Sequence, residues 1–526
     1  MPEITDVVPG AGVNDSCLHQ VPAMKAPRTR LSDTTLLILF GVAIFLVHLA
    51  VNGRYGFHRD ELLTYDNARH LAWGYVVYPP LTPFLARVEL LLFGASLRGF
   101  RFIAAAAQGI MALFTGLTAR EMGAQRYGQT IAAAAFAISG PSLFNGGFMS
   151  YATLDELWWV LAAWSVARLL RTQNPRWWVS VGAAIGLGLM TRYTIGLLVL
   201  GILGGLLFTS ARRNYKSPWF WAGAAIALAI CLPNFLWQMQ HDFIWLKWVH
   251  SIHARDVRDG GTDDFLLNQL WKITNPATVP LWITGLWLVL VKPEGKPWRL
   301  LGWMYAVPLL ILLVLRGRDY YLAGAYPILF AAGAVQMERW LATLSARAAG
   351  TVRGVTWWAF AANGLILAGI ALPLAPINSR WWHIADAATG GNYNSQIGWP
   401  EGVASVAHVR DALTLEEQAS YAILVGDDGE AGAIDLYGPA YHLPPSISGM
   451  NSAWARGYGD PPPQTIIAVN MDPDFLERSF ASCQVAARLS NRWGIANSAV
   501  PNADVYVCRG LRKPWPEFWA KFQYYG

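Results

Sequence analysis

The stretch Thr35–Val51 reads TLLILFGVAIFLVHLAV and contains no Asp, Glu, Lys or Arg. A helix that crosses the hydrocarbon core of a bilayer needs roughly 20 predominantly apolar residues, and about eleven runs of the chain approach that length. The further runs are Phe102–Ala119, Thr130–Phe144, Leu154–Leu169, Trp178–Met190, Thr194–Phe208, Trp219–Gln238, Ala277–Val291, Leu300–Leu315, Tyr321–Val335 and Thr356–Leu374. The sequence therefore predicts a mainly α-helical, polytopic transmembrane protein.

The composition supports this prediction. Charged residues make up 14% of the 526 residues, hydrophobic residues make up 54%, and 26 residues are Trp. An ordinary soluble domain has about 25% charged residues, so this chain has too few to cover one soluble globule. The abundance of apolar and aromatic residues also excludes a disordered chain.

Basic residues indicate the orientation, because Lys and Arg collect in short cytoplasmic loops. If the spans alternate, one face receives Arg120, Arg126, Arg168, Arg171, Arg176, Arg212, Arg213, Lys216, Lys292, Lys296, Arg299, Arg339, Arg347 and Arg353, with Lys25, Arg28 and Arg30 before the first span. We therefore expect a cytoplasmic tail (1–34), a transmembrane domain (35–376) and an extracytoplasmic domain (377–526). These loops account for most of the net charge of +6, so the charge does not indicate a nucleic-acid partner.

The last 150 or so residues have the composition of a small soluble α/β domain, of typical size. Ala422–Gly426, Thr465–Asn470 and Val505–Cys508 are predicted strands, with helices near Val403–Ala412 and Asp474–Phe480. Cys483 and Cys508 both lie in this exported part, where a disulfide is permitted. Their pairing is left open, because the sequence does not give their distance.

The first external loop contains His58-Arg59-Asp60-Glu61. A carboxylate here can take a proton from an attacking hydroxyl or hold a divalent cation. The tetrapeptide is also typical of a solvated helix start, where acids are favoured.

The second external loop ends in Tyr151-Ala-Thr-Leu-Asp155-Glu156. Thr153 and Glu156 have the spacing of a capping box, which needs no further function. Asp155 is not part of that box, so the pair is a candidate for a metal or base site.

Basic and aromatic residues open two later external turns. Arg192 lies in one, and Arg318, Tyr320 and Tyr321 lie in the other. Arg offers a forked donor that fits phosphate oxygens, but Arg and Tyr are also common where helices leave the membrane. His241, His250 and His253 lie in one long loop without the spacing of a zinc motif.

Several of these motifs resemble a known family. Tyr55-Gly-Phe-His-Arg-Asp60-Glu61-Leu, Ala68-Arg-His-Leu-Ala-Trp-Gly-Tyr75 and Pro79-Pro80-Leu81 are similar to the first external loop of bacterial family 39-like glycosyltransferases. Asp155-Glu156 resembles their second acidic motif, and Arg318-Asp-Tyr-Tyr321 resembles the segment before a late span. These are GT-C membrane enzymes related to protein mannosyltransferases and to the lipid A aminoarabinose transferase. Tyr78 stands where the relatives usually have Lys or His.

The resemblance implies a GT-C fold and an inverting transfer of a sugar from a polyprenyl-phosphate donor to a lipid, glycan or protein acceptor. The reaction would take place at the extracytoplasmic face of a bacterial inner membrane. By similarity Asp60, with Glu61, would be the catalytic base, and Asp155 and Glu156 would position it, with a divalent cation as the one cofactor considered. The residues that would contact substrate are Arg59, Arg192, Arg318, Tyr320 and Tyr321. Of these, Arg192, Arg318 and Tyr321 would stabilise the departing phosphate.

Two other classes of function remain open. A transporter or flippase of lipid-linked sugars would place polar groups or broken helices at mid-membrane. A non-catalytic envelope assembly factor would tolerate the loss of Asp60. The sequence does not identify the sugar, the acceptor or the oligomeric state.

Overall fold

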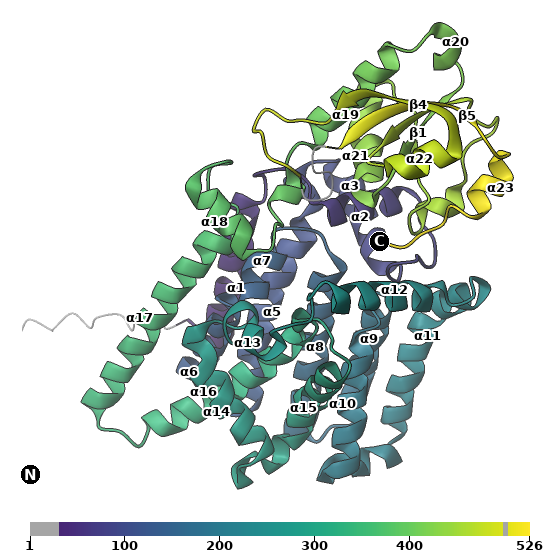
Figure 1. Cartoon of the computed structure of the whole chain (residues 1–526). Coiled ribbons are helices and arrows are strands. Elements are labelled where there is room, and N and C mark those ends of the chain that lie inside the picture. Colours follow the sequence, from purple (N-terminus) through teal and green to yellow (C-terminus); the bar gives the residue numbers. More distant parts are fainter. Residues whose placement is uncertain (1–30, 498–502) are drawn as a thin grey trace, which may run out of the picture.

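The computed structural model describes residues 31–497 and 503–526. A bundle of helices carries a smaller α/β domain at one end (Figure 1). The predicted cytoplasmic tail up to residue 30, with Cys17, lies outside the described residues.

Each predicted apolar run is helical, with bounds that shift by a few residues. The helices are α1 (Asp33–Val51), α5 (Phe102–Glu121), α6 (Arg126–Ala137), α8 (Tyr151–Thr172), α9 (Trp177–Leu189), α10 (Ile195–Phe208), α11 (Pro218–Gln240), α14 (Val279–Leu290), α15 (Arg299–Val314), α16 (Tyr326–Leu341) and α17 (Ala346–Ala371). The run predicted over Thr130–Phe144 breaks at Ser139, which caps the short helix α7 (Gly140–Asn145).

Five helical segments in the described part of the chain are long and apolar enough to cross a membrane alone, and up to seven if two bent pairs each count as one span. One bent pair joins α10 to the 3-10 helix η1 (Ser210–Lys216), and the other joins Phe265–Ile273 to Pro276–Leu290. The chain is thus a multi-pass membrane protein. The exact number of crossings stays a prediction, because several helices are shorter than a span.

Glycines let neighbouring helices approach closely. A Cβ added at Gly109 in α5 would lie 2.4 Å from the carbonyl oxygen of Gly41 in α1. A Cβ at Gly182 in α9 would lie 2.0 Å from the carbonyl oxygen of Gly223 in α11. Small residues at such crossings bring the two backbones into van der Waals contact, which drives helix association in lipid.

The long loops after α1 and α11 contain helices of their own. After α1 follow α2 (Arg59–Arg69), α3 (Leu81–Phe93) and α4 (Leu97–Phe100). After α11 follow α12 (Ile244–Arg258), α13 (Phe265–Asn268), the π-helix η2 (Gln269–Ile273) and the 3-10 helix η3 (Pro276–Thr278). Two further 3-10 helices precede later helices of the bundle: η4 (Pro293–Trp298) precedes α15, and η5 (Asp319–Ala325) precedes α16. In Figure 1, α2 and α12 lie at the end of the bundle that carries the α/β domain.

The C-terminal domain is built on a five-stranded sheet with the order β2-β1-β3-β5-β4. Its strands are β1 (Tyr421–Val425), β2 (Ser446–Ile447), β3 (Thr465–Val469), β4 (Phe480–Arg488) and β5 (Asp504–Leu511). β1 is parallel to β2 and β3, whereas β5 is antiparallel to β3 and β4. The three predicted strands are confirmed as β1, β3 and β5. Strands β2 and β4 were not predicted.

Helices surround this sheet. They are α18 (Arg380–Ala388), the 3-10 helix η6 (Asn394–Gln396), α19 (Trp399–Asp411), α20 (Leu415–Gln418), α21 (Asp428–Tyr437), the 3-10 helices η7 (Gly438–Tyr441) and η8 (Ala453–Arg456), α22 (Pro473–Ser479) and α23 (Trp515–Ala520). The predicted helices near Val403–Ala412 and Asp474–Phe480 correspond to α19 and α22.

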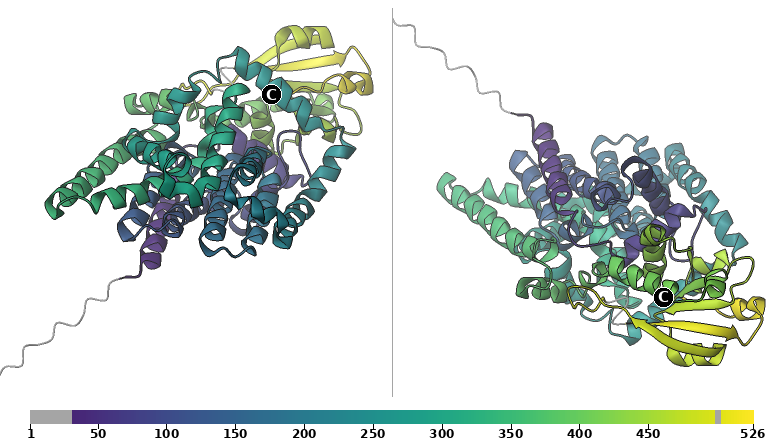
Figure 2. Two further views of the ribbon diagram at one scale, coloured as in Figure 1. Left: turned by 90° about the horizontal axis from the view of Figure 1, so that it is seen from below. Right: turned by 90° about the horizontal axis from the view of Figure 1, so that it is seen from above.

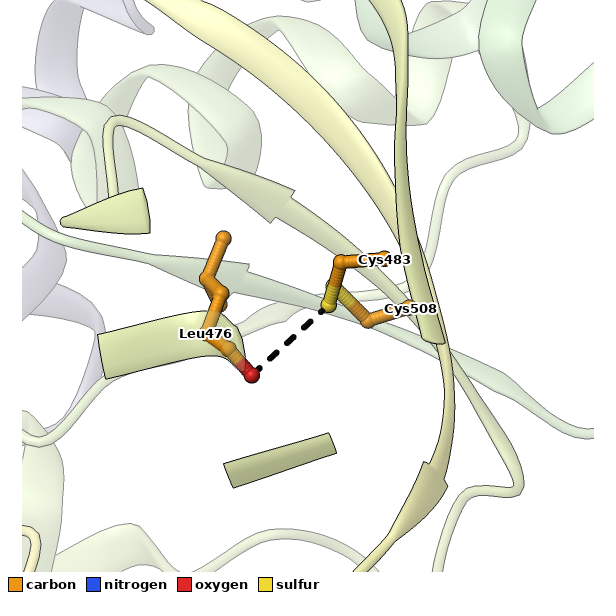
Figure 3. Close-up of a disulfide and its surroundings, with 3 residues drawn as sticks. All are labelled: Leu476, Cys483 and Cys508. Carbon is orange, nitrogen blue, oxygen red and sulfur yellow. Dashed lines mark hydrogen bonds between the residues drawn. A yellow bond between two sulfur atoms is a disulfide. The ribbon is translucent and has the colours of Figure 1, made fainter. Parts of the chain in front are cut away.

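Cys483 in β4 and Cys508 in β5 stand opposite each other in the sheet and form a disulfide (Figure 3). The Cys483 sulfur lies 3.9 Å from the carbonyl oxygen of Leu476 at the end of α22. The pairing that the sequence left open is therefore present, and it links the edge strand β4 to the rest of the sheet.

The C-terminal domain contacts the bundle through α2. A Cβ added at Gly432 of α21 would lie 2.2 Å from the carbonyl oxygen of Leu62 in α2. Arg456 pairs with the buried Asp66 of α2 at 2.6 Å, and Arg69 donates to the carbonyl oxygen of Asp435 at 2.9 Å. The helix that carries His58-Arg59-Asp60-Glu61 is thus enclosed between the bundle and the α/β domain; the view from above shows the domain over this part of the bundle (Figure 2).

Candidate functional site

The motif at residues 58–61 begins helix α2. The ring nitrogen Nδ1 of His58 accepts from the backbone N–H of Asp60 at 3.1 Å, and the Glu61 carboxylate accepts from the backbone N–H of His58 at 2.9 Å. This reciprocal arrangement is a capping box with His as the N-cap. The first turn is therefore fixed, and it presents Arg59 and Asp60 away from the helix axis.

A cavity of about 390 Å³ lies above this first turn. Polar side chains from five separate segments line it: His58, Arg59, Asp60, Asn145, Ser150, Tyr151, Lys272, Arg318, Tyr320, Thr389 and Asn392. Apolar side chains also line it: Phe144, Phe148, Trp271, Ile273, Leu367 and Ile370. The cavity is thus amphipathic, with charged side chains such as Asp60 and Arg318 and large apolar side chains from α7, η2 and α17.

Asp60 is the carboxylate that faces the cavity. Its side chain is 41% exposed, and its oxygens lie 3.5 Å from Nε of Arg59 and 3.9 Å from Nδ1 of His58. Burial lowers the pKa of His58, so the ring is neutral. Since Nδ1 already accepts a hydrogen bond, the protonated Nε2 donates to Asn392 at 3.1 Å. Arg59 is therefore the cation beside Asp60.

Glu61 does not line the cavity, although the sequence paired it with Asp60 as a catalytic residue. Its side chain is fully buried and receives two hydrogen bonds from Arg101, at 2.6 and 2.9 Å, and one from the backbone N–H of Met149 at 3.0 Å. With the cap at His58 its acceptor positions are filled. The geometry gives Glu61 the role of joining α2, α5 and the segment before α8.

Two residues of the later predicted turn, Arg318 and Tyr320, line the same cavity as Asp60. Arg318 lines the cavity and is held by Asp256 of α12 through a forked pair at 2.5 and 2.7 Å. It also donates to the hydroxyl of Tyr320 at 3.1 Å. Arg318, Tyr320 and Asp60 therefore share one cavity, as the sequence-based site required.

Arg192 and Tyr321 lie next to Tyr320. Arg192 donates to the Tyr320 hydroxyl at 3.3 Å, and its guanidinium lies 4.4 Å from the centre of the Tyr321 ring and 4.9 Å from that of Tyr151. Neither Arg192 nor Tyr321 lines the cavity. They support Tyr320, which does.

Asp155 and Glu156 are buried in α8 and do not line the cavity either. Asp155 accepts from the hydroxyl of Thr194 at 2.6 Å, and Glu156 accepts from the side-chain amide of Asn145 at 2.8 Å. No cluster of three or more His, Cys, Asp or Glu suited to a metal occurs among the described residues. A cation usually needs several converging oxygen ligands, so this donor set does not fit the predicted divalent cation.

The sequence reasoning did not identify three participants. Lys272 of η2 lines the cavity and pairs with Asp319 at 2.7 Å. Asp256 orients Arg318, and Arg101 pairs with Glu61. A charged residue directly before an apolar run, as Arg101 is, would have been a signal. The pairing of Asp256 with Arg318 spans two loops and has no local sequence signal.

Tyr78, which departs from the pattern of the similar family, is buried. Its hydroxyl accepts from the side-chain amide of Asn67 at 2.9 Å, and its ring lies 5.1 Å from that of Tyr151. It packs behind the cavity and does not line it.

Comparison with known proteins confirms the resemblance to GT-C glycosyltransferases. The family model for dolichyl-phosphate-mannose-protein mannosyltransferases matches residues 77–237. No curated protein sequence gives a match.

Among solved structures, ArnT from Cupriavidus metallidurans bound to undecaprenyl phosphate is 17% identical, with 90% of this chain and 97% of that chain covered and a TM-score of 0.55. The apo state of the same protein is 16% identical, with 90% of this chain and 98% of that chain covered and a TM-score of 0.54. The arabinofuranosyltransferase AftD from Mycobacteria is 15% identical over 93% of this chain and 40% of that chain, with a TM-score of 0.50. The fold is therefore GT-C-like.

Proposed function

We propose that the protein is an inverting glycosyltransferase that moves a sugar from a polyprenyl-phosphate donor to an acceptor hydroxyl. The observation that carries this proposal is the cavity itself. A half-exposed carboxylate, Asp60, lines the same cavity as the cations Arg318 and Lys272 and several large apolar side chains. A lipid-linked phosphosugar has the same three parts: a reacting carbon, a charged phosphate and an apolar chain.

Asp60 serves as the general base. It accepts the proton of the acceptor hydroxyl as that oxygen bonds to the anomeric carbon from the side opposite the phosphate. The bond between the anomeric carbon and the phosphate oxygen then breaks, and the electron pair leaves with the phosphate. Arg59, whose Nε lies 3.5 Å from the carboxylate, keeps Asp60 oriented.

Arg318, Tyr320 and Lys272 stabilise the departing phosphate. Its negative charge grows as the glycosidic bond breaks, and fixed donors aimed at developing charge lower the barrier. Arg192 adds a positive charge directly behind Tyr320 and acts through that hydroxyl. Asp155, Glu156 and Glu61 are positioning residues, because each is bonded to neighbouring elements and none contacts the cavity.

The cellular setting follows from the same reasoning. The short loops at the end of the bundle away from the cavity are rich in Lys and Arg, and such loops favour the cytoplasmic face. We therefore place the cavity and the C-terminal domain on the extracytoplasmic side of a bacterial inner membrane. The donor would be a polyprenyl-phosphate sugar in the outer leaflet, and the acceptor an envelope lipid, glycan or protein.

The direct test uses the purified full-length protein in liposomes made with a total lipid extract of the producing cells. Release of free polyprenyl phosphate is followed by mass spectrometry. We expect Asp60→Asn to lower the rate by a factor of roughly 10² to 10⁴, the usual contribution of a general base. Asp474→Asn, an exposed carboxylate of α22, is the matched control and should retain the wild-type rate.

Wild-type turnover by a folded Asp60→Asn protein would overturn this assignment. If neither the wild type nor Asp60→Asn released polyprenyl phosphate, the result would favour an assembly factor. Movement of intact lipid-linked sugar across the liposome membrane, without release, would instead indicate a transporter.

A further inference from the structure

A second large cavity lies at the other end of helix α8. Tyr151, the first residue of α8, lines the cavity of Asp60, whereas Leu169, Leu170 and the following Gln173 line the second one. A helix rises about 1.5 Å per residue, so the 22 residues of α8 separate the two cavities by about the thickness of a bilayer core. The second cavity therefore opens near the opposite membrane surface.

This second cavity has a volume of about 570 Å³ and is formed where α8, η1 and η4 meet. Two cations, Arg213 and Lys296, line it together with Thr209, Ser210, Asn214 and Ser217. An adjoining cavity of about 420 Å³ shares Thr209, Ser210 and Lys296 and adds Arg212 and Arg299. Neither lining contains an acidic side chain.

The four cations have no carboxylate partners. Within residues 31–497 and 503–526, no ion pair involves Arg212, Arg213, Lys296 or Arg299. Arg213 donates only to the neutral side chain of Gln173, and Nε of Arg299 is buried without an acceptor.

Two nearby basic residues, in contrast, have a carboxylate partner. Arg168 and Arg171, on the same end of α8, both pair with the buried Glu121, at 2.6 and 2.8 Å. The absence of an acid from the cavity is thus a local property, and its positive charge favours an anion from outside the protein.

We propose that this cavity binds a phosphate group. Arg offers paired donors that match phosphate oxygens, and Lys adds a point charge. The hydroxyl of Ser210 is a further donor of the kind that binds phosphate, whereas the Thr209 hydroxyl donates to the carbonyl oxygen of Gly205 at 2.7 Å. A basic pocket between membrane helices on the cytoplasmic side is the expected receptor for an anionic lipid headgroup.

A phospholipid and a soluble phosphate would offer the same group. Leu207 and Phe208, which line the smaller cavity, are 60% and 71% exposed and lie at the end of α10. They provide an apolar surface for acyl chains next to the cations. We therefore expect the phosphate to belong to an anionic phospholipid of the leaflet opposite the cavity of Asp60.

The test is native mass spectrometry of the full-length protein in detergent, titrated separately with phosphatidylglycerol and with inorganic phosphate. Arg213→Gln/Lys296→Gln removes two of the cations. Arg339→Gln/Arg347→Gln is the matched control, because it removes two exposed cations at the ends of α16 and α17 that line neither cavity. We expect phosphatidylglycerol affinity to fall at least about tenfold in the first variant, since each cation near the surface contributes measurably to anionic-lipid binding.

The control should bind phosphatidylglycerol as the wild type does. Displacement of phosphatidylglycerol by millimolar inorganic phosphate would support the phosphate site and identify the soluble anion as a competing source. Equal binding of both probes to the wild type and to Arg213→Gln/Lys296→Gln would overturn the proposal. The outcome does not depend on the glycosyltransferase activity.

Discussion

At the scale of single residues, Asp60 and Glu61 show how one helix turn separates two carboxylates. Asp60 is 41% exposed at the cavity, whereas Glu61 is fully buried against Arg101. Successive residues of a helix point about 100° apart, and here the step from Asp60 to Glu61 turns the second carboxylate from the cavity toward Arg101. Glu61 holds the turn in place.

Glu61→Gln should therefore destabilise the protein. Removing one partner of a buried ion pair leaves an uncompensated charge and costs about 3–5 kcal/mol. We expect a clearly lower midpoint of thermal unfolding for Glu61→Gln and an unchanged midpoint for Asp60→Asn, measured in the same detergent. If Glu61→Gln unfolded at the wild-type temperature but lost activity, Glu61 would have a direct part in the chemistry.

Asp428, the first residue of α21, provides a pH-dependent prediction. Burial, and then the neighbouring Asp427, raise its pKa to about 7. In the unfolded chain its pKa is about 3.9, so between roughly pH 4 and pH 7 the folded state holds a proton that the unfolded state has lost. Stability should fall as the pH rises through this window.

Asp428→Asn removes this titration. Its unfolding midpoint should decline less than that of the wild type between pH 5 and pH 7. Asp474→Asn, an exposed site, should follow the wild-type profile. Parallel profiles for Asp428→Asn and the wild type would show that Asp428 does not titrate in this range.

The sequence identified the charged members of the site better than their roles. Arg59, Asp60, Arg318 and Tyr320 do line one cavity. Burial could not be read from the sequence. The sequence therefore grouped Glu61 with Asp60, although the Glu61 side chain is buried against Arg101 and does not line the cavity.

At the scale of elements, α2 connects the two halves of the molecule. α21 of the C-terminal domain approaches so closely that only glycine fits at position 432, where a Cβ would lie 2.2 Å from the Leu62 carbonyl oxygen. Arg456 and the buried Asp66 add an ion pair to the same interface. The domain thereby fixes the helix that presents Asp60.

Gly432→Ala should loosen this interface. We expect faster tryptic cleavage between the bundle and the C-terminal domain, together with lower transfer activity. Gly402→Ala in α19 is the matched control, since its Cβ would have no heavy atom closer than 4.0 Å. There alanine should be neutral or stabilising by up to about 1 kcal/mol. The same cleavage rate in both variants would show that α21 does not hold α2.

The apolar runs gave the helices of the bundle because length and hydropathy are local properties. The short helices α3 and α12 were not predicted, since they lie in loops of mixed composition, whereas the helix start at His58 was one of the two interpretations of that tetrapeptide. Strand β4 was also missed. Its residues are largely exposed at the sheet edge, so they lack the apolar pattern that identified β1 and β3.

At the scale of the whole molecule, the two ends of the bundle differ in charge and in shape. One end carries the α/β domain (Figure 1). The cavity of Asp60 lies at this end, whereas the cavity at Arg213 lies among basic loops at the other end of α8. This polarity is what a membrane enzyme needs to keep one orientation.

The disulfide reports on that orientation. A bridge that closes a loop of 25 residues stabilises a domain by roughly 3 kcal/mol, and it forms in an oxidising compartment. In denatured, non-reduced protein from native membranes we expect Cys17 and Cys231 to react with a thiol reagent, and all 4 cysteines to react after reduction. Labelling of all four without reduction would place the C-terminal domain on the reducing side.

The central claim is that the protein transfers a lipid-linked sugar, and the most direct measurement is made in the native cell. The gene is deleted and then restored as wild type or as Asp60→Asn, and the extractable polyprenyl-phosphate sugars and envelope glycans are compared by mass spectrometry. We predict that one lipid-linked sugar accumulates in the deletion and Asp60→Asn cells, that the same sugar is lost from one envelope product, and that the wild-type gene reverses both changes. Unchanged pools in the deletion cells, or full restoration by Asp60→Asn, would contradict the account.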